Sequence, residues 1–71
     1  MSESFAGIDV SRDHLDLHER PGGQSQRYAN DDAGVQALGA RLAELAPTRI
    51  VVEATGGLEV PLVLALVERR F

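Results

Sequence analysis

Two short apolar runs, each with a single acidic residue at its end, limit what this chain can fold into more than any other feature. Phe5–Val10 is almost wholly apolar and carries Asp9, and Arg49–Glu53 is a β-branched run that closes on Glu53. Short apolar runs of this kind are typical of strands buried on both faces of a sheet. Because the connection between them is long enough for a crossover, we expect the two runs to be central, parallel neighbours.

Between the two runs the sequence predicts a hairpin and a helix. Residues 14–19 alternate polar and apolar side chains, as a half-exposed strand does, and Pro21-Gly22-Gly23 marks a turn before a polar edge strand over Gln24–Ala29. Capping side chains at Asn30–Asp32 then precede an amphipathic helix that ends before Pro47. The apolar positions of this helix recur at steps of three and four residues: Val35, Leu38, Leu42 and Leu45.

The last element is a second helix that is apolar on almost every side. It follows the turn Ala54–Gly57 and has Glu59 and Pro61 in its first turn. Its apolar residues are Val60, Leu62, Val63, Leu64, Ala65, Leu66 and Val67. We expect such a helix to be buried on more than one side, although a chain of 71 residues cannot bury it fully. The predicted architecture is therefore an α/β fold of order βββαβα with a mixed sheet, in which the first and fourth strands are parallel.

Size and charge restrict the organisation and the partners. A chain of 71 residues holds at most one small domain, and its abrupt end after the second helix predicts a single, incomplete domain over residues 1–71. No cysteine is present, so neither a disulfide nor a cysteine zinc site supports the core. The net charge of -4 opposes binding of nucleic acid through bulk charge, so such a partner needs a localised site.

The sequence gives no sign of export or of a membrane span. Its longest apolar run is far shorter than the ~20 residues that cross a bilayer. The first residues also lack the basic region of a secretory signal. These observations predict a cytoplasmic protein that does not enter a membrane.

Asp9 and Glu53 are the main candidates for chemistry. If the strands that carry them are parallel neighbours, the two acids lie at the same edge of the sheet, on strands ~4.8 Å apart. Carboxylates so placed would converge on one hard cation, which predicts a magnesium site. The alternative is that each acid only caps the turn after its strand or is solvated at the strand end.

Two further groups of residues have weaker claims. Thr55 and Gly57 would present a hydroxyl and a backbone N–H to a nucleic-acid phosphate at the start of the second helix, whereas Gly56 and Gly57 would also serve simply to permit the turn. His14 and His18 share the polar face of their strand, but no other residue at ligand spacing joins them. We therefore interpret the histidines as exposed.

Several motifs in this order resemble the start of the DEDD transposases related to the Piv invertases, a family of insertion-sequence proteins. The resemblance covers almost the whole chain, and its motifs are specific together rather than singly. They are Gly7-Ile8-Asp9-Val10-Ser11, Leu15-Asp16-Leu17, Asn30 with Gly34 and Leu38, Val51-Val52-Glu53-Ala54-Thr55-Gly56-Gly57, and Pro61-Leu62-Val63. The resemblance implies the beginning of a ribonuclease H-like (RuvC-like) fold.

The resemblance also implies a function. Members of that family hold Mg²⁺ or Mn²⁺ with four acids to cut and rejoin DNA, some with a guide RNA, and the first two acids correspond to Asp9 and Glu53. The other two acids have no counterpart here, and neither does the family's nucleophilic serine. The resemblance therefore implies a transposase or recombinase fragment that binds metal weakly and is inactive alone.

Two other functions stay open at this stage. One is a non-catalytic module left from a transposase gene, which would form a homodimer through the uncovered strand Arg49–Glu53 and through the apolar residues Val60, Val63, Leu64 and Val67. The other is a fragment of an actin-like sugar kinase, whose first phosphate loop also follows a Gly-Ile-Asp strand. That loop needs small residues near phosphate, whereas the corresponding turn here is Ser11-Arg12-Asp13-His14, which weakens the kinase interpretation.

Overall fold

The computed structural model describes residues 3–54, 56–58 and 60–69. They form a four-stranded sheet and two helices, in the order β1 (Phe5–Val10), β2 (His14–Arg20), β3 (Ser25–Ala29), α1 (Asp32–Leu45), β4 (Arg49–Glu53) and α2 (Val60–Glu68). The strands lie in the order β3-β2-β1-β4, with β1 antiparallel to β2 and parallel to β4. The predicted α/β class, the βββαβα order and the mixed sheet with its parallel pair are confirmed.

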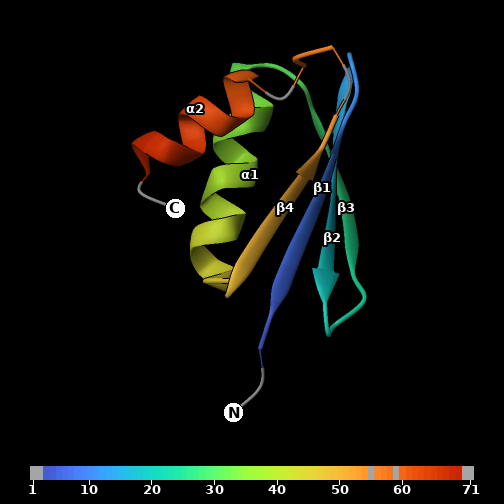
Figure 1. Cartoon of the computed structure of the whole chain (residues 1–71), viewed down its shortest axis with the longest axis vertical. Helices are drawn as coiled ribbons and strands as arrows, with labels where there is room; N and C mark the ends of the chain where they lie inside the picture. Colours follow the sequence, from blue (N-terminus) through green and yellow to red (C-terminus); the bar gives the residue numbers. More distant parts are fainter. Residues whose placement is uncertain (1–2, 55, 59, 70–71) are drawn as a thin grey trace.

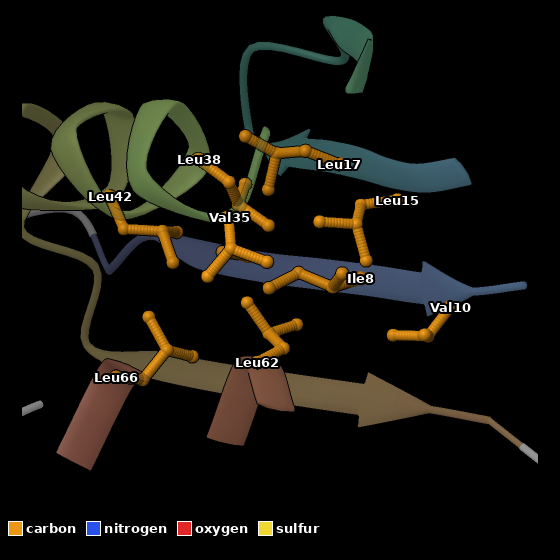
Figure 2. Close-up of a cluster of buried hydrophobic side chains, with 10 residues drawn as sticks. Ile8, Val10, Leu15, Leu17, Val35, Leu38, Leu42, Leu62 and Leu66 are labelled. Carbon is orange, nitrogen blue, oxygen red and sulfur yellow. The ribbon is translucent and has the colours of Figure 1, made fainter. Parts of the chain in front are cut away.

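The core lies between the sheet and a single layer of helices. Both helices pack on the same face of the sheet, as Figure 1 shows. Figure 2 shows leucines of α1 and α2 meeting the inward side chains of β1 and β2. The buried hydrophobic residues are Ala6, Ile8, Val10, Leu15, Leu17, Val35, Leu38, Leu42, Leu62 and Leu66. Since each buried aliphatic side chain of this size contributes roughly 2 kcal/mol, this cluster is the main source of stability.

The prediction that β1 is buried on both faces is wrong for the described residues. Buried and more exposed side chains alternate along β1, with Ile8 buried and Asp9 exposed. β4 shows the same alternation and forms an edge of the sheet rather than a central strand. The reason is that both described helices cover one face, so the other face of these apolar strands meets no helix of the described part.

Strong capping fixes where α1 starts and ends. The side chain of Asp31 accepts a hydrogen bond from the backbone N–H of Gly34 at 2.7 Å, which satisfies one of the unpaired donors of the first turn. At the other end Ala46 adopts the left-handed conformation, with φ of 45°, and its N–H donates to the carbonyl of Leu42. The predicted cap at Asn30–Asp32 is thus confirmed and assigned to Asp31.

The start of α1 lies very close to β3. A Cβ atom placed on Gly34 would come within 1.7 Å of the carbonyl oxygen of Ala29, the last residue of β3. No side chain fits in that space. The absence of one at position 34 is therefore what allows α1 to pack directly after the hairpin.

A partly buried ion pair also joins α1 to the sheet. Glu19 of β2 is 7% exposed, and both its carboxylate oxygens accept hydrogen bonds from the Arg41 guanidinium, at 3.0 Å each. Arg41 also donates to Glu44, one turn further along α1. This bidentate pair fixes the rotation of α1 about its axis, because a planar guanidinium and a planar carboxylate match in one relative orientation.

Helix α2 is buried on one side only, which corrects the expectation that it would be covered on several. Leu62 and Leu66 are buried against the core, whereas Leu64 and Val67 are 59% and 62% exposed. The helix layer is one helix thick. Among the described residues, α2 therefore packs against α1 and the sheet, and its other side is exposed. Neither α2 nor α1 has the length and apolar character to cross a membrane, as far as the described residues extend.

Candidate functional site

The face of the sheet opposite the helices, which we call the open face, holds the polar residues of interest. Residues that alternate with the buried positions of each strand point to this face, and the strand register arranges them in three cross-strand rows. The acid row is Glu53, Asp9, Asp16 and Arg27; the glycine row is Val51, Gly7, His18 and Ser25; the arginine row is Arg49, Phe5 and Arg20.

The structure brings Asp9 and Glu53 together in the acid row. They are direct register partners on the parallel strands β1 and β4, and both are exposed. Both also line the same pocket. Because neighbouring strands lie ~4.8 Å apart, the two carboxylates share one space above the sheet.

Asp9 also contacts His18, which sequence reasoning interpreted as a solvated histidine. The Nε2 atom of His18 lies 3.2 Å from Oδ2 of Asp9, and its Nδ1 atom lies 3.0 Å from Oγ of Ser25. A neutral imidazole has one N–H, so when Nε2 donates to Asp9, Nδ1 accepts from the Ser25 hydroxyl. The chain of contacts holds the Asp9 carboxylate at the rim of the pocket. The alternation of polar and apolar residues along β2 indicated on which face of the sheet His18 lies. It did not indicate the contact with Asp9, because that contact depends on the register between β2 and β1.

Asp16, the next acid of the row, has its charge balanced by Arg27. The Arg27 guanidinium donates to both carboxylate oxygens, with Nε at 2.7 Å from Oδ1 and Nη2 at 3.3 Å from Oδ2. This hydrogen bonding holds the pKa of Asp16 below its ordinary value, although partial burial acts in the opposite direction. The Asp16 carboxylate therefore stabilises the folded state at pH values above its ordinary pKa. This stabilisation is lost as the pH falls through the lowered pKa. Asp16 forms an ion pair with Arg27, so we do not assign it to a ligand.

An open pocket of about 250 Å³ follows the glycine row. Its lining residues are Gly7, Ile8, Asp9, His18, Arg20, Val51 and Glu53. Gly7 forms the floor, and a Cβ atom on it would meet no other atom within 4 Å. The pocket is thus a trough left by a missing side chain, and it connects the two acids to Arg20.

The second predicted site is described only in part. Thr55 lies outside the described residues. Gly56 and Gly57 both have positive φ angles, of 64° and 75°, and the Gly57 carbonyl accepts a hydrogen bond from the N–H of Val60 at the start of α2. A positive φ strongly favours glycine, so the turn by itself accounts for both residues. Gly57 as a phosphate-binding residue stays a prediction.

The donor atoms at the acid row suit a hard cation better than zinc. Across residues 3–54, 56–58 and 60–69, no group of three or more His, Cys, Asp or Glu side chains is arranged to hold a metal ion. Structural zinc needs four such ligands, whereas Mg²⁺ is often bound by one or two carboxylates and several waters. The pair of oxygen donors on Asp9 and Glu53 fits the second description.

Comparison with known proteins adds no assignment. No protein-family model matches the chain, and no curated protein matches it significantly. The function is therefore inferred from the geometry of the open face and from the sequence motifs.

Proposed function

We propose that the chain is a RuvC-like part of a DNA transposase of the Piv invertase-related family, which cuts and rejoins DNA with a divalent metal. The pairing of Asp9 with Glu53 across β1 and β4 is the observation that carries this proposal. Two of the four metal-binding acids of that family have counterparts here, so we expect no strand cleavage by this chain alone. The partners of the full-length protein are DNA and, in members that use one, a guide RNA. We also propose that the protein acts in the cytoplasm.

Asp9 and Glu53 are the residues that would hold Mg²⁺ or Mn²⁺, with water completing the coordination. When bound, such an ion would act as a Lewis acid on an oxygen of a phosphodiester. His18 orients the Asp9 carboxylate through its Nε2 contact. Arg27 neutralises Asp16, which reduces the repulsion that three adjacent carboxylates would otherwise create.

Metal binding tests this proposal directly. Asp9→Asn and Glu53→Gln each remove one of the two anionic ligands, so each should weaken Mn²⁺ binding by more than about tenfold. Titration followed by electron paramagnetic resonance of free Mn²⁺ gives the dissociation constant. Paramagnetic broadening in NMR spectra should centre on the acid row and its neighbour Gly7.

Two acids on the helix layer supply matched controls. Asp32→Asn, in the first turn of α1, and Glu68→Gln, at the end of α2, make the same changes of charge away from the open face. Both should leave the affinity for Mn²⁺ within about twofold of the original value, since neither side chain belongs to the acid row or lines the pocket and solvent screens exposed charges. Unchanged binding in Asp9→Asn, or equal losses in the controls, would contradict the metal site.

A second candidate function, self-association, is favoured by the uncovered side of α2. Val60, Val63, Leu64 and Val67 are all exposed there. The spacing of these four residues is symmetric about the middle of the set. In an antiparallel pair of α2 helices, Val60 therefore lies opposite Val67 of a second copy, and Val63 lies opposite Leu64 of that copy. A symmetric contact of this kind lets one apolar patch cover itself. We propose that the chain forms a homodimer through this patch.

Replacing Leu64 with glutamate should convert this dimer to a monomer, because each contact would then bury two like charges across the two-fold axis. Sedimentation velocity at micromolar concentrations measures the change. Ala40→Glu, at an exposed position of α1, is the matched control and should leave the dimer intact. A wild-type protein that sediments as a monomer throughout this range would rule the dimer out.

A further inference from the structure

The arginine row is the part of the open face that the proposed metal chemistry does not use. Phe5 of β1 has Arg20 of β2 as its register partner on one side and Arg49 of β4 on the other. Direct partners on adjacent strands have Cβ atoms ~5 Å apart, so an arginine side chain leaves the sheet on each side of one aromatic side chain. The three residues come from distant parts of the sequence and meet only because of the sheet order.

All three side chains of this row are available to a ligand. Phe5 is 38% exposed although it is aromatic, and both arginines are exposed. Within the part of the chain that the structure describes, neither Arg20 nor Arg49 forms an ion pair, whereas Arg27 and Arg41 do. The row is therefore a local concentration of uncompensated positive charge around an exposed ring, in a protein whose net charge is -4.

This combination fits one class of ligand, an unpaired segment of nucleic acid. Bases stack on exposed aromatic rings of single-strand binding proteins, and arginines beside the ring contact the backbone phosphates. A partner with phosphates but no bases would leave Phe5 unused, and an apolar partner would leave two charged groups desolvated. A chain that carries both bases and phosphates uses all three side chains.

The position of the row relative to the acids adds a second argument. Phe5 and Asp9 are four residues apart on β1, which is ~13 Å along a strand, a distance that a short nucleotide segment can span. The trough over Gly7 runs between them and is lined at its ends by Arg20 and by Asp9 with Glu53. The pocket therefore connects Arg20 of the arginine row with both acids of the acid row.

We propose that Arg20, Phe5 and Arg49 form a binding site for an unpaired nucleotide segment, with a base stacked on Phe5 and the flanking phosphates on the two arginines. The site deepens the proposed function, because it holds a substrate strand a few nucleotides from the metal-binding acids. Only the suggested link between this site and the acid row rests on the proposed function. The row binds nucleic acid without metal.

The test measures binding of fluorescein-labelled octamers of deoxythymidine and of uridine by fluorescence anisotropy, at low salt and in the presence of EDTA. EDTA removes divalent metal, so this experiment succeeds or fails independently of the metal site at Asp9 and Glu53. Phe5→Leu keeps an apolar side chain but removes the ring, and should weaken binding by roughly tenfold. Arg20→Gln and Arg49→Gln should each reduce the slope of log K against log salt concentration by about 0.7.

Arg69→Gln is the matched control. Arg69 follows α2 on the helix layer, where it donates to Gln36, and its loss makes the same change of charge away from the row. It should leave both the affinity and the salt slope unchanged. Circular dichroism of each variant verifies that the fold is retained.

The outcomes separate the proposal from its rivals. Equal weakening of the binding of the DNA and RNA octamers by Phe5→Leu supports a site that recognises bases and phosphates of either nucleic acid. Weakening of one octamer alone also supports the site and shows whether its ligand is DNA or RNA. Absence of binding by the wild-type protein, or unchanged binding of both octamers in Phe5→Leu, overturns the proposal. So does displacement of the octamers by an acidic peptide of equal charge as readily as by unlabelled octamer, which would mean that charge alone is recognised.

Discussion

Replacing Gly34 with alanine should lower the free energy of unfolding by about 3 kcal/mol, enough to leave much of the protein unfolded at room temperature. The added Cβ would stand 1.7 Å from the carbonyl oxygen of Ala29 and 2.7 Å from its carbonyl carbon. These are backbone atoms and cannot rotate away. The start of α1 would have to leave β3, which also weakens the hydrogen bond from Gly34 to the Asp31 cap.

Gly22→Ala provides the control for this variant. Gly22 lies in the turn between β2 and β3, its φ is not positive, and a Cβ atom there would meet nothing within 4 Å. Urea denaturation followed by circular dichroism should show a change within about 0.5 kcal/mol for Gly22→Ala. If both variants unfold at the same urea concentration, the close approach of α1 to β3 is not present in solution.

The second large effect should come from Arg41→Met, at a cost of about 2 kcal/mol. This change removes both hydrogen bonds to Glu19, whose side chain is 9% exposed, and leaves a charge without a partner. Breaking a fully buried pair costs 3–5 kcal/mol. Because the Arg41 side chain is 29% exposed, water screens part of the loss, and we expect a smaller value.

A double-mutant cycle distinguishes a stranded charge from lost packing. Glu19→Leu combined with Arg41→Met removes both charges and should recover most of the stability lost in Arg41→Met, since apolar replacements of buried pairs are often neutral. Arg27→Met is the exposed counterpart, because the Arg27 side chain is 62% exposed in its pair with Asp16. It should cost less than about 1 kcal/mol. Equal losses in Arg41→Met and Arg27→Met would show that burial of Glu19 has no energetic consequence.

The sequence was sufficient for the order and direction of the elements. The β-branched run at Arg49–Glu53, its single acid and the long crossover before it predicted a strand parallel to β1, and the structure has this pair. The placement of Asp9 beside Glu53 followed from the same facts. Local periodicity and the length of a connection are properties of the sequence itself, which is why these predictions were possible.

Features that depend on register or on layer thickness were not predicted. The contact of His18 with Asp9 and the alignment of Phe5 with two arginines require knowledge of which residues face each other across strands. Glu19 occupies an inward position of β2, next after Leu15 and Leu17 in the alternation, and only the arrival of Arg41 from α1 explains its burial. The apolar residues of α2 indicated burial but not how many neighbours the helix would have.

The floor of the trough at Gly7 implies a compromise between stability and access. Gly7 lies in the middle of a central strand, where a β-branched side chain would favour the extended backbone and where glycine costs roughly 0.5–1 kcal/mol relative to alanine. A Cβ atom on Gly7 would meet no other atom within 4 Å. A strand optimised for folding alone would carry valine at this position. The chain instead keeps glycine here, where a larger residue would fill the trough between Arg20 and the acid row.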